Sequence, residues 1–282
     1  MDTDSPSVRL ACCPDSESSK QGTNVRAAIA FDATDRQPAL LVSFVYLKPF
    51  LIHRHRYHFR DWVLDSGAFS AFQSGTQIKL QDYIDTAKRL IAEDPKLTEV
   101  FALDVIGDWK SSLRNTEEMW RQGIRAIPCY HCGEPESVLR GLAKDYPKIA
   151  LGGVAVANRH LKTRFASECF ARVWPKPIHG FGYGKESHIM AFPWHSVDAT
   201  NWEADPCRFG RWRAFGCKRL SVRGSSQNLR AEVEWYLKLE DRARDRWRNE
   251  MAKLNAGDLT LRLAEGNAAN VRRREDAFGS HE

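Results

Sequence analysis

The stretch WVLDSGAF, residues 62–69, carries the strongest fold signal in the chain. A short apolar run ends at Asp65 and passes at once into the turn residues Ser66 and Gly67. An amphipathic segment follows over Leu80–Glu93, where apolar side chains recur at helical spacing. The stretch therefore predicts a strand–helix unit with a carboxylate at the carboxyl end of its strand.

The same alternation of short apolar runs and amphipathic segments continues on both sides. Strands are expected at residues 40–47, 62–64, 100–103, 124–129, 149–151, 178–181, 196–197 and 219–222. A last helix is expected over residues 227–254. Alternating strands and helices imply a parallel sheet, and about eight units in about 220 residues favour a closed α/β (β/α)8 TIM barrel. An open doubly wound sheet is the alternative.

Chemistry-bearing residues fall repeatedly at the ends of these expected strands. They are Asp65, Asp104, His131, Gly153, Gly182 and Asp198. Barrel enzymes place their active sites at the carboxyl ends of the strands, so this coincidence favours the barrel independently.

Length and composition predict a single barrel domain with two extensions. The chain has 282 residues, of which 43% are hydrophobic, which is enough for one large core. We expect a flexible N-terminal arm at residues 1–24, the barrel at 25–255, and a charged flexible tail at 256–282. The seven cysteines do not suggest a disulfide framework, and no long apolar run is present. A cytoplasmic location is expected.

Two carboxylates from distant strands predict a particular chemistry. Asp65 and Asp198 each end a short apolar run, and two such groups at a barrel mouth suggest double displacement at a sugar carbon. Each also has a simpler interpretation, as a turn residue and as a cap respectively. Asp104 lies inside the apolar stretch FALDVI, where a carboxylate is costly unless it is paired or used.

The segment CYHC at residues 129–132 contains a Cys-x-x-Cys spacing. A zinc site needs two further ligands, and Cys207 and Cys217 do not form a partner motif. We therefore expect buried or rim cysteines and no metal, and regard His131 as a hydrogen-bonding group at the mouth. Whether these cysteines bind a metal is left open.

Basic residues interleaved with aromatic ones suit a nucleic-acid backbone with stacked or flipped bases. The net charge is +6, so the position of the charge matters more than its sum. The residues expected to contact nucleic acid are Arg208, Arg211, Arg213, Lys218, Arg219, Arg54 and Arg56. A solvated surface is the alternative interpretation.

Three short motifs, in order, resemble the tRNA-guanine transglycosylase superfamily. DSGAF at 65–69 resembles the motif around that family's acid/base aspartate, and GGVAV at 152–156 resembles its base-contacting Gly-Gly-Leu-Ala-Val loop. FGYG at 181–184, followed by Val197 and Asp198, resembles the segment that leads to its nucleophile. The similarity covers roughly residues 40–223.

The resemblance implies a (β/α)8 barrel that exchanges guanine for a 7-deazaguanine base such as preQ0, without a cofactor. It implies Asp198 as nucleophile, Asp65 as general acid/base, and Asp104 as a ligand of the heterocycle's Watson–Crick edge. Further base-binding residues would be Ser66, Gly67, His131, Gly152, Gly153 and Gly182. His131 stands where the tRNA enzymes usually have a glutamine.

The chain departs from the tRNA enzymes in lacking their Cys-x-Cys-x-x-Cys…His zinc motif after the nucleophile. That loss favours the divergent branch, often phage-encoded, that inserts 7-deazaguanines into DNA. Alternatives are a tRNA enzyme, a non-catalytic nucleic-acid-binding partner subunit, and a glycosidase or base-excising glycosylase. A homodimer or an accessory subunit is also left open.

Overall fold

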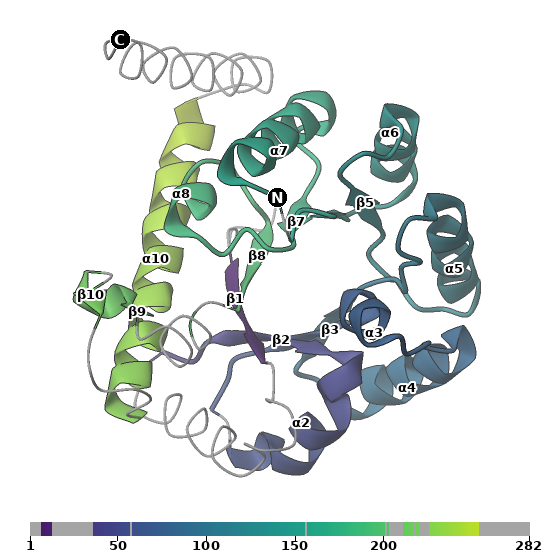
Figure 1. Ribbon diagram of the computed structural model, residues 1–282, viewed down its shortest axis with the longest axis horizontal. Coiled ribbons are helices and arrows are strands. Elements are labelled where there is room, and N and C mark those ends of the chain that lie inside the picture. Colours follow the sequence, from purple (N-terminus) through teal and green to yellow (C-terminus); the bar gives the residue numbers. More distant parts are fainter. Residues whose placement is uncertain are drawn as a thin grey trace.

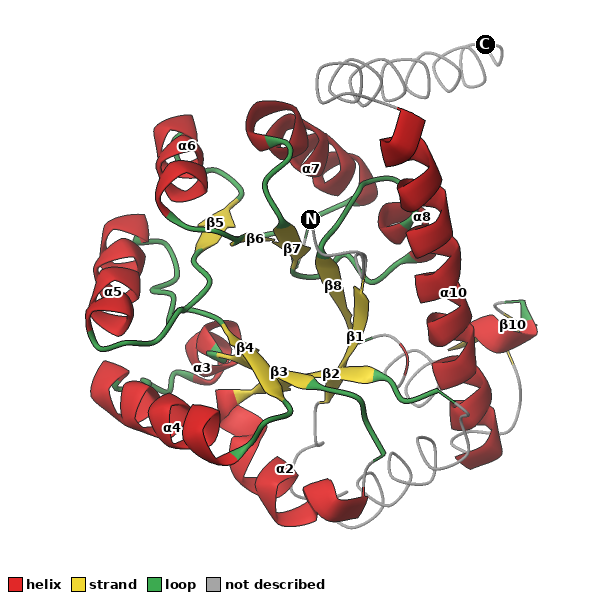
Figure 2. Cartoon of the chain, turned by 180° about the vertical axis from the view of Figure 1, so that it is seen from behind, coloured by secondary structure: helices red, strands yellow, loops and turns green. Residues whose placement is uncertain are grey.

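Eight parallel strands form one curled sheet with helices around its outside (Figure 1). The computed structural model describes residues 7–12, 36–56, 58–155, 157–200, 202, 211–216, 218–219 and 226–253. The strands of the sheet are β1 (Ser7–Cys12), β2 (Ala39–Ser43), β3 (Trp62–Asp65), β4 (Leu97–Val100), β5 (Cys129–His131), β6 (Ile149–Gly152), β7 (Ile178–Gly180) and β8 (Ser196–Ala199). The view from behind shows the same ring of strands inside a ring of helices (Figure 2).

The sheet is closed into a barrel. Its strand order is β4-β3-β2-β1-β8-β7-β6-β5, which leaves β4 and β5 at the two ends. A parallel bridge between Phe101 and Ile127 joins these ends. The Ile127 N–H donates to the Val100 carbonyl at 2.8 Å, and the Ala102 N–H donates to the Ile127 carbonyl at 2.9 Å. The predicted α/β barrel is therefore confirmed, and the open doubly wound alternative is excluded.

The helices cover the outer face of the barrel. They are α2 (Leu47–His53), α3 (Ala68–Ser74), α4 (Leu80–Glu93), α5 (Trp109–Arg121), α6 (Glu136–Asp145), α7 (Arg159–Val173), α8 (Glu186–Ile189) and α10 (Ser226–Lys253), with 3-10 turns η1 (Phe44–Tyr46), η2 (Arg54–Arg56) and η3 (Arg213–Phe215). Helix α4 has the predicted bounds. Helix α5 begins at Trp109, because the Asp108 carboxylate accepts the Ser111 N–H at 3.1 Å and caps the helix there. Among the helices that the structure describes, none is long and apolar enough to span a membrane.

Strand alternation divides the core into two parts. On β3, Trp62 and Leu64 pack outward against the helices, whereas Val63 faces the barrel interior. The interior cluster is small and includes Leu41 and Phe101. The much larger cluster lies between strands and helices. The polar groups at the carboxyl ends of the strands therefore sit on an apolar layer of the barrel interior.

The prediction of a flexible arm at residues 1–24 is wrong for Ser7–Cys12. This segment is β1, which pairs with β2 on one side and β8 on the other. Val8 and Leu10 belong to the outer core. Arg9 is buried and forms an ion pair with Asp61 at 2.6 Å. The compensated charge allows a strand with an inward arginine to occupy the middle of the sheet. The other residues of the predicted arm, and the predicted tail at 256–282, lie outside the described residues.

The prediction of a closing barrel strand at 219–222 is also wrong for Arg219, the part of this segment that the structure describes. Lys218–Arg219 forms β10, which pairs antiparallel with β9 (Arg211–Trp212) in a separate two-stranded sheet. Strand β1 occupies the place in the barrel that this segment was predicted to fill. Residues 220–222 lie outside the described part of the chain.

Candidate active site

The carboxyl ends of the strands bring three distant aspartates into one electrostatic cluster. Asp65 is the last residue of β3, Asp104 follows β4, and Asp198 lies in β8. The charges of Asp104 and Asp198 both raise the pKa of Asp65. The structure thus places together the carboxylates that the sequence predicted to meet, although they are separated by up to 133 residues in the chain (198 − 65).

Asp198 is buried and held by a backbone donor. Its Oδ1 accepts the Gly182 N–H at 2.6 Å. Burial raises the pKa of the Asp198 carboxyl to about 6, against the lowering effect of the Gly182 hydrogen bond and of the charge on Lys162. The group is therefore mostly ionised at neutral pH and fixed in one orientation, as a nucleophilic carboxylate requires.

Asp65 titrates close to neutral pH. Burial, followed by the charge of Asp104, raises the pKa of the Asp65 carboxyl to about 7. Its Oδ2 accepts the Gly67 N–H at 3.1 Å. A carboxyl that titrates near neutrality can both give and take a proton, which is the property of a general acid/base.

Asp104 joins His131 and Glu134 in a second polar group at the same mouth. Asp104 Oδ2 lies 3.3 Å from His131 Nε2, and Glu134 Oε1 lies 3.0 Å from His131 Nδ1. Burial raises the pKa of Asp104, although the His131 hydrogen bond opposes this. The pKa of His131 is raised by the neighbouring Cys129 sulfur and by its bonds to Asp104 and Glu134. Asp104 and Glu134 therefore hold the His131 ring from its two nitrogens, and the group offers both donors and acceptors at the mouth.

The turn after Asp65 depends on Gly67. Gly67 has φ +74°, and a Cβ there would lie 2.6 Å from the Ser43 Oγ and 2.8 Å from the Val45 Cγ2. Ser66 is buried, and its hydroxyl accepts the Ala68 N–H at 3.4 Å. The Asp-Ser-Gly sequence is therefore needed to aim the Asp65 carboxylate and to begin α3.

We expect Gly67→Ala to destabilise the fold by about 1–3 kcal/mol, from left-handed backbone strain together with the close contact to β2. It should also reduce activity, because the backbone shift that relieves the clash moves the residue 67 N–H that Asp65 accepts. Gly75→Ala is the matched control, since Gly75 has φ +66° and no atom within 4 Å of its Cβ position. Urea unfolding of both variants checks this, and equal destabilisation would show that the contact to Ser43 is unimportant.

The remaining predicted base-binding glycines also lie at the mouth. Gly152 ends β6 and its carbonyl accepts the Cys132 N–H at 3.2 Å, while Gly153 follows it. Gly182 supplies the N–H that Asp198 accepts. Base binding by these glycines remains a prediction.

Of the predicted nucleic-acid contacts, Arg54 lies away from the aspartates. Arg54 forms an ion pair with Asp94 at 2.5 Å, just before β4, which is the amino-terminal end of the barrel opposite the mouth. Arg56 belongs to the same turn. Arg213 lies 4.0 Å from the buried Glu232 and stacks over Tyr236. Arg211, Lys218 and Arg219 belong to the small β9–β10 sheet, and Arg208 lies outside the described residues.

Two residues at the mouth were missed by the sequence reasoning. Lys162, in the first turn of α7, donates to the Gly182 carbonyl at 3.2 Å and acts electrostatically on Asp198. The Glu134 carboxylate forms hydrogen bonds with both the ring Nδ1 and the backbone N–H of His131. Their positions shortly after β6 and β5 were the available signal, because loops at the carboxyl ends of barrel strands carry the site.

Together the fold and the site define an α/β barrel with a carboxylate-lined mouth. No protein-family model matches the chain, and no curated protein matches it. Among solved structures, the chain is similar to a mutant tryptophan synthase alpha-subunit from the hyperthermophile Pyrococcus furiosus, with 12% identity and a TM-score of 0.44. That likeness covers 82% of this chain and 96% of the other. The assignment of the barrel rests on the strand order and its closure.

Proposed function

We propose that the protein is a base-exchange transglycosylase that replaces guanine in DNA with a 7-deazaguanine base of the preQ0 type. The observation that supports this best is the pairing of Asp198 with Asp65 at one barrel mouth. One carboxyl has a pKa of about 6 and the other of about 7. Asp198 is fixed by the Gly182 N–H and Asp65 ends β3 at the same mouth, so the two carboxyls can divide the roles of nucleophile and acid/base. The resemblance of the DSGAF, GGVAV and FGYG segments to the transglycosylase superfamily points the same way.

In the first half-reaction, the target guanine is flipped out of the stack, at a cost of a few kcal/mol. An Asp198 oxygen attacks C1′ of the nucleotide and forms a C–O bond as the C1′–N9 bond breaks. The electron pair of that bond goes to guanine, which takes the proton of Asp65 and leaves as the neutral base. Asp104 and His131 are proposed to hold the edge of the heterocycle.

In the second half-reaction, the 7-deazaguanine occupies the place of guanine. Asp65, now ionised, removes the N9 proton of the incoming base. The N9 atom attacks C1′, and the bond to Asp198 breaks with return of its electron pair to the carboxylate. Two inversions give net retention, as in retaining glycosidases, and neither step needs a redox cofactor.

The choice of DNA over tRNA rests on the sequence after the nucleophile. The tRNA enzymes have a zinc motif there, and this chain has only Cys207 and Cys217, without the required spacing. A protein without that motif lacks the part that helps the tRNA enzymes to hold their substrate. The basic and aromatic residues of 207–223 are proposed to contact the DNA backbone.

The direct test offers radiolabelled guanine or preQ0 to the purified protein with duplex DNA and unmodified tRNA side by side. Label that enters DNA alone supports the proposal. Label in tRNA alone would keep the chemistry and overturn the substrate, whereas release of free guanine without incorporation would indicate a glycosylase. Label in neither, with binding intact, would favour a non-catalytic partner subunit.

The exchange rate should depend on pH with a bell-shaped profile. Asp198 must be ionised to attack, so kcat/KM rises as pH increases through about 6. Asp65 must be protonated to release guanine in the first half-reaction, so kcat/KM for DNA falls as pH increases through about 7. Because the two carboxyls interact, the apparent pKa values of the two limbs describe the pair and not either residue alone. A profile that stays flat from below the lower limb to above the upper limb would contradict these roles.

A further inference from the structure

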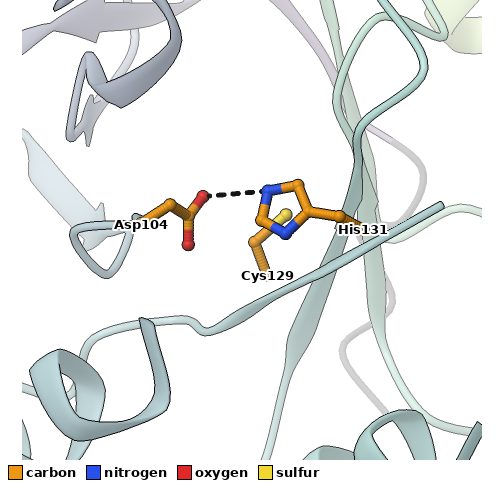
Figure 3. A group of neighbouring side chains, drawn as sticks. All are labelled: Asp104, Cys129 and His131. Carbon is orange, nitrogen blue, oxygen red and sulfur yellow. Dashed lines mark ion pairs between the residues drawn. The ribbon is translucent and has the colours of Figure 1, made fainter. Parts of the chain in front are cut away.

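A group of three potential metal ligands lies in the barrel mouth. One ligand atom from each of Asp104, Cys129 and His131 lies within 4.8 Å of the others, and the three side chains converge in Figure 3. Cys129 and His131 are two residues apart on β5 and therefore face the same side of the strand. Asp104 reaches them from the loop after β4.

The distances suit a small cation with tetrahedral coordination. Zinc bonds to nitrogen and oxygen are about 2.0–2.2 Å long, so two such ligands at a tetrahedral angle stand about 3.3–3.6 Å apart. The separation of His131 Nε2 and Asp104 Oδ2 is 3.3 Å. Cys129 is buried beside them and adds a sulfur ligand, which favours zinc over magnesium or calcium.

The surroundings orient the histidine as a metal site requires. Glu134 accepts at His131 Nδ1 at 3.0 Å, which directs Nε2 toward Asp104. A carboxylate behind a ligating histidine fixes its tautomer and strengthens it as a ligand. Gly152 also leaves room, because a Cβ at that position would lie 2.8 Å from the Cys129 Sγ.

We propose that Asp104, Cys129 and His131 bind one Zn²⁺ ion with a fourth coordination position open to the mouth. Cys129 gives up its thiol proton to solvent when the ion binds. The open position would accept water or a carbonyl oxygen of a bound heterocycle. This site goes beyond the proposed function, since exchange by Asp198 and Asp65 requires no metal. With the ion bound, Asp104 and His131 would hold the heterocycle through the ion rather than by direct hydrogen bonds. It also differs from the Cys-x-x-Cys interpretation, because Cys132 is not one of the three side chains whose ligand atoms lie together.

The test is a titration of chelator-treated full-length protein with Co²⁺, followed by competition with Zn²⁺. A thiolate-to-cobalt charge-transfer band with intense visible bands, saturating at one equivalent, is expected for the wild type and for Cys132→Ser. Cys129→Ser should lose the charge-transfer band, and His131→Ala should lose tight binding. Glu134→Gln, which alters only the positioning of His131, should weaken binding about 10–100-fold.

The proposal is overturned if the wild type shows no charge-transfer band, or if Cys132→Ser removes it while Cys129→Ser keeps it. Circular dichroism verifies that each variant folds. Asp198→Asn distinguishes metal binding from base exchange, since this variant should bind Co²⁺ like the wild type while it lacks exchange. Metal binding without exchange in the wild type would overturn only the proposed function, and exchange without metal binding would overturn only the zinc site.

Discussion

Asp198→Asn should reduce base exchange by about 10⁴-fold or more, because it removes the nucleophile and leaves no group to form the C1′–O bond. Asparagine has nearly the same shape as aspartate, and its side-chain carbonyl can still accept the Gly182 N–H that Asp198 accepts at 2.6 Å. The fold and the position of the side chain should therefore be kept. The measurement is label incorporation under single-turnover conditions.

A second readout identifies the intermediate directly. Wild-type protein mixed with DNA and no incoming base should form a covalent protein–DNA adduct that survives denaturing electrophoresis, and Asp198→Asn should form none. Asp85→Asn is the matched control, because Asp85 is exposed on α4 and its carboxylate accepts a hydrogen bond from Gln81 of the same helix. Normal exchange by Asp198→Asn would refute the proposed mechanism.

The barrel could be predicted from the sequence because its signals are local. The helix at Leu80–Glu93 has the predicted bounds, and its buried Tyr83, Ile84, Ala87 and Leu90 show the helical spacing that identified it. Strand β1 could not be recognised in the same way. Its single Arg9 interrupts a short apolar run, and that charge is compensated by Asp61 and Glu99, which are distant in sequence. Long-range pairing of this kind leaves no local pattern.

In the site too, local patterns predicted some features and long-range contacts decided others. Asp65, Asp104 and Asp198 could be predicted to meet because each follows or ends a strand, and the barrel brings such positions to one face. The interaction of Asp104 with His131 and Cys129 depends on side-chain directions across two strands, which spacing alone does not give. Arg54 was misleading for a related reason. Its neighbours in sequence are basic, but its partner in space is Asp94.

Glu240→Ala should destabilise the protein by about 3–5 kcal/mol, because it removes the centre of a buried ionic network. Glu240 is fully buried on α10, and its Oε2 accepts the Val8 N–H of β1 at 2.8 Å. Its Oε1 lies 3.2 Å from Arg60 and 2.9 Å from Arg244. The substitution leaves a buried N–H without its acceptor and several guanidinium groups without their shared carboxylate. Urea unfolding measures the loss.

Glu234→Ala is the matched control, since Glu234 is exposed on the same helix and its loss should change the free energy of unfolding by no more than about 0.5 kcal/mol. If Glu240→Ala does not fold, Glu240→Gln keeps the test, because it retains an acceptor for Val8 and loses only the charge. The loss of Glu240 should affect the active site as well. Arg9 of β1 is in register with Asp198 of β8, so weaker attachment of β1 to α10 loosens the strand that lies beside the nucleophile. A Glu240 variant as stable as the Glu234 control would show that α10 does not hold β1 in the barrel.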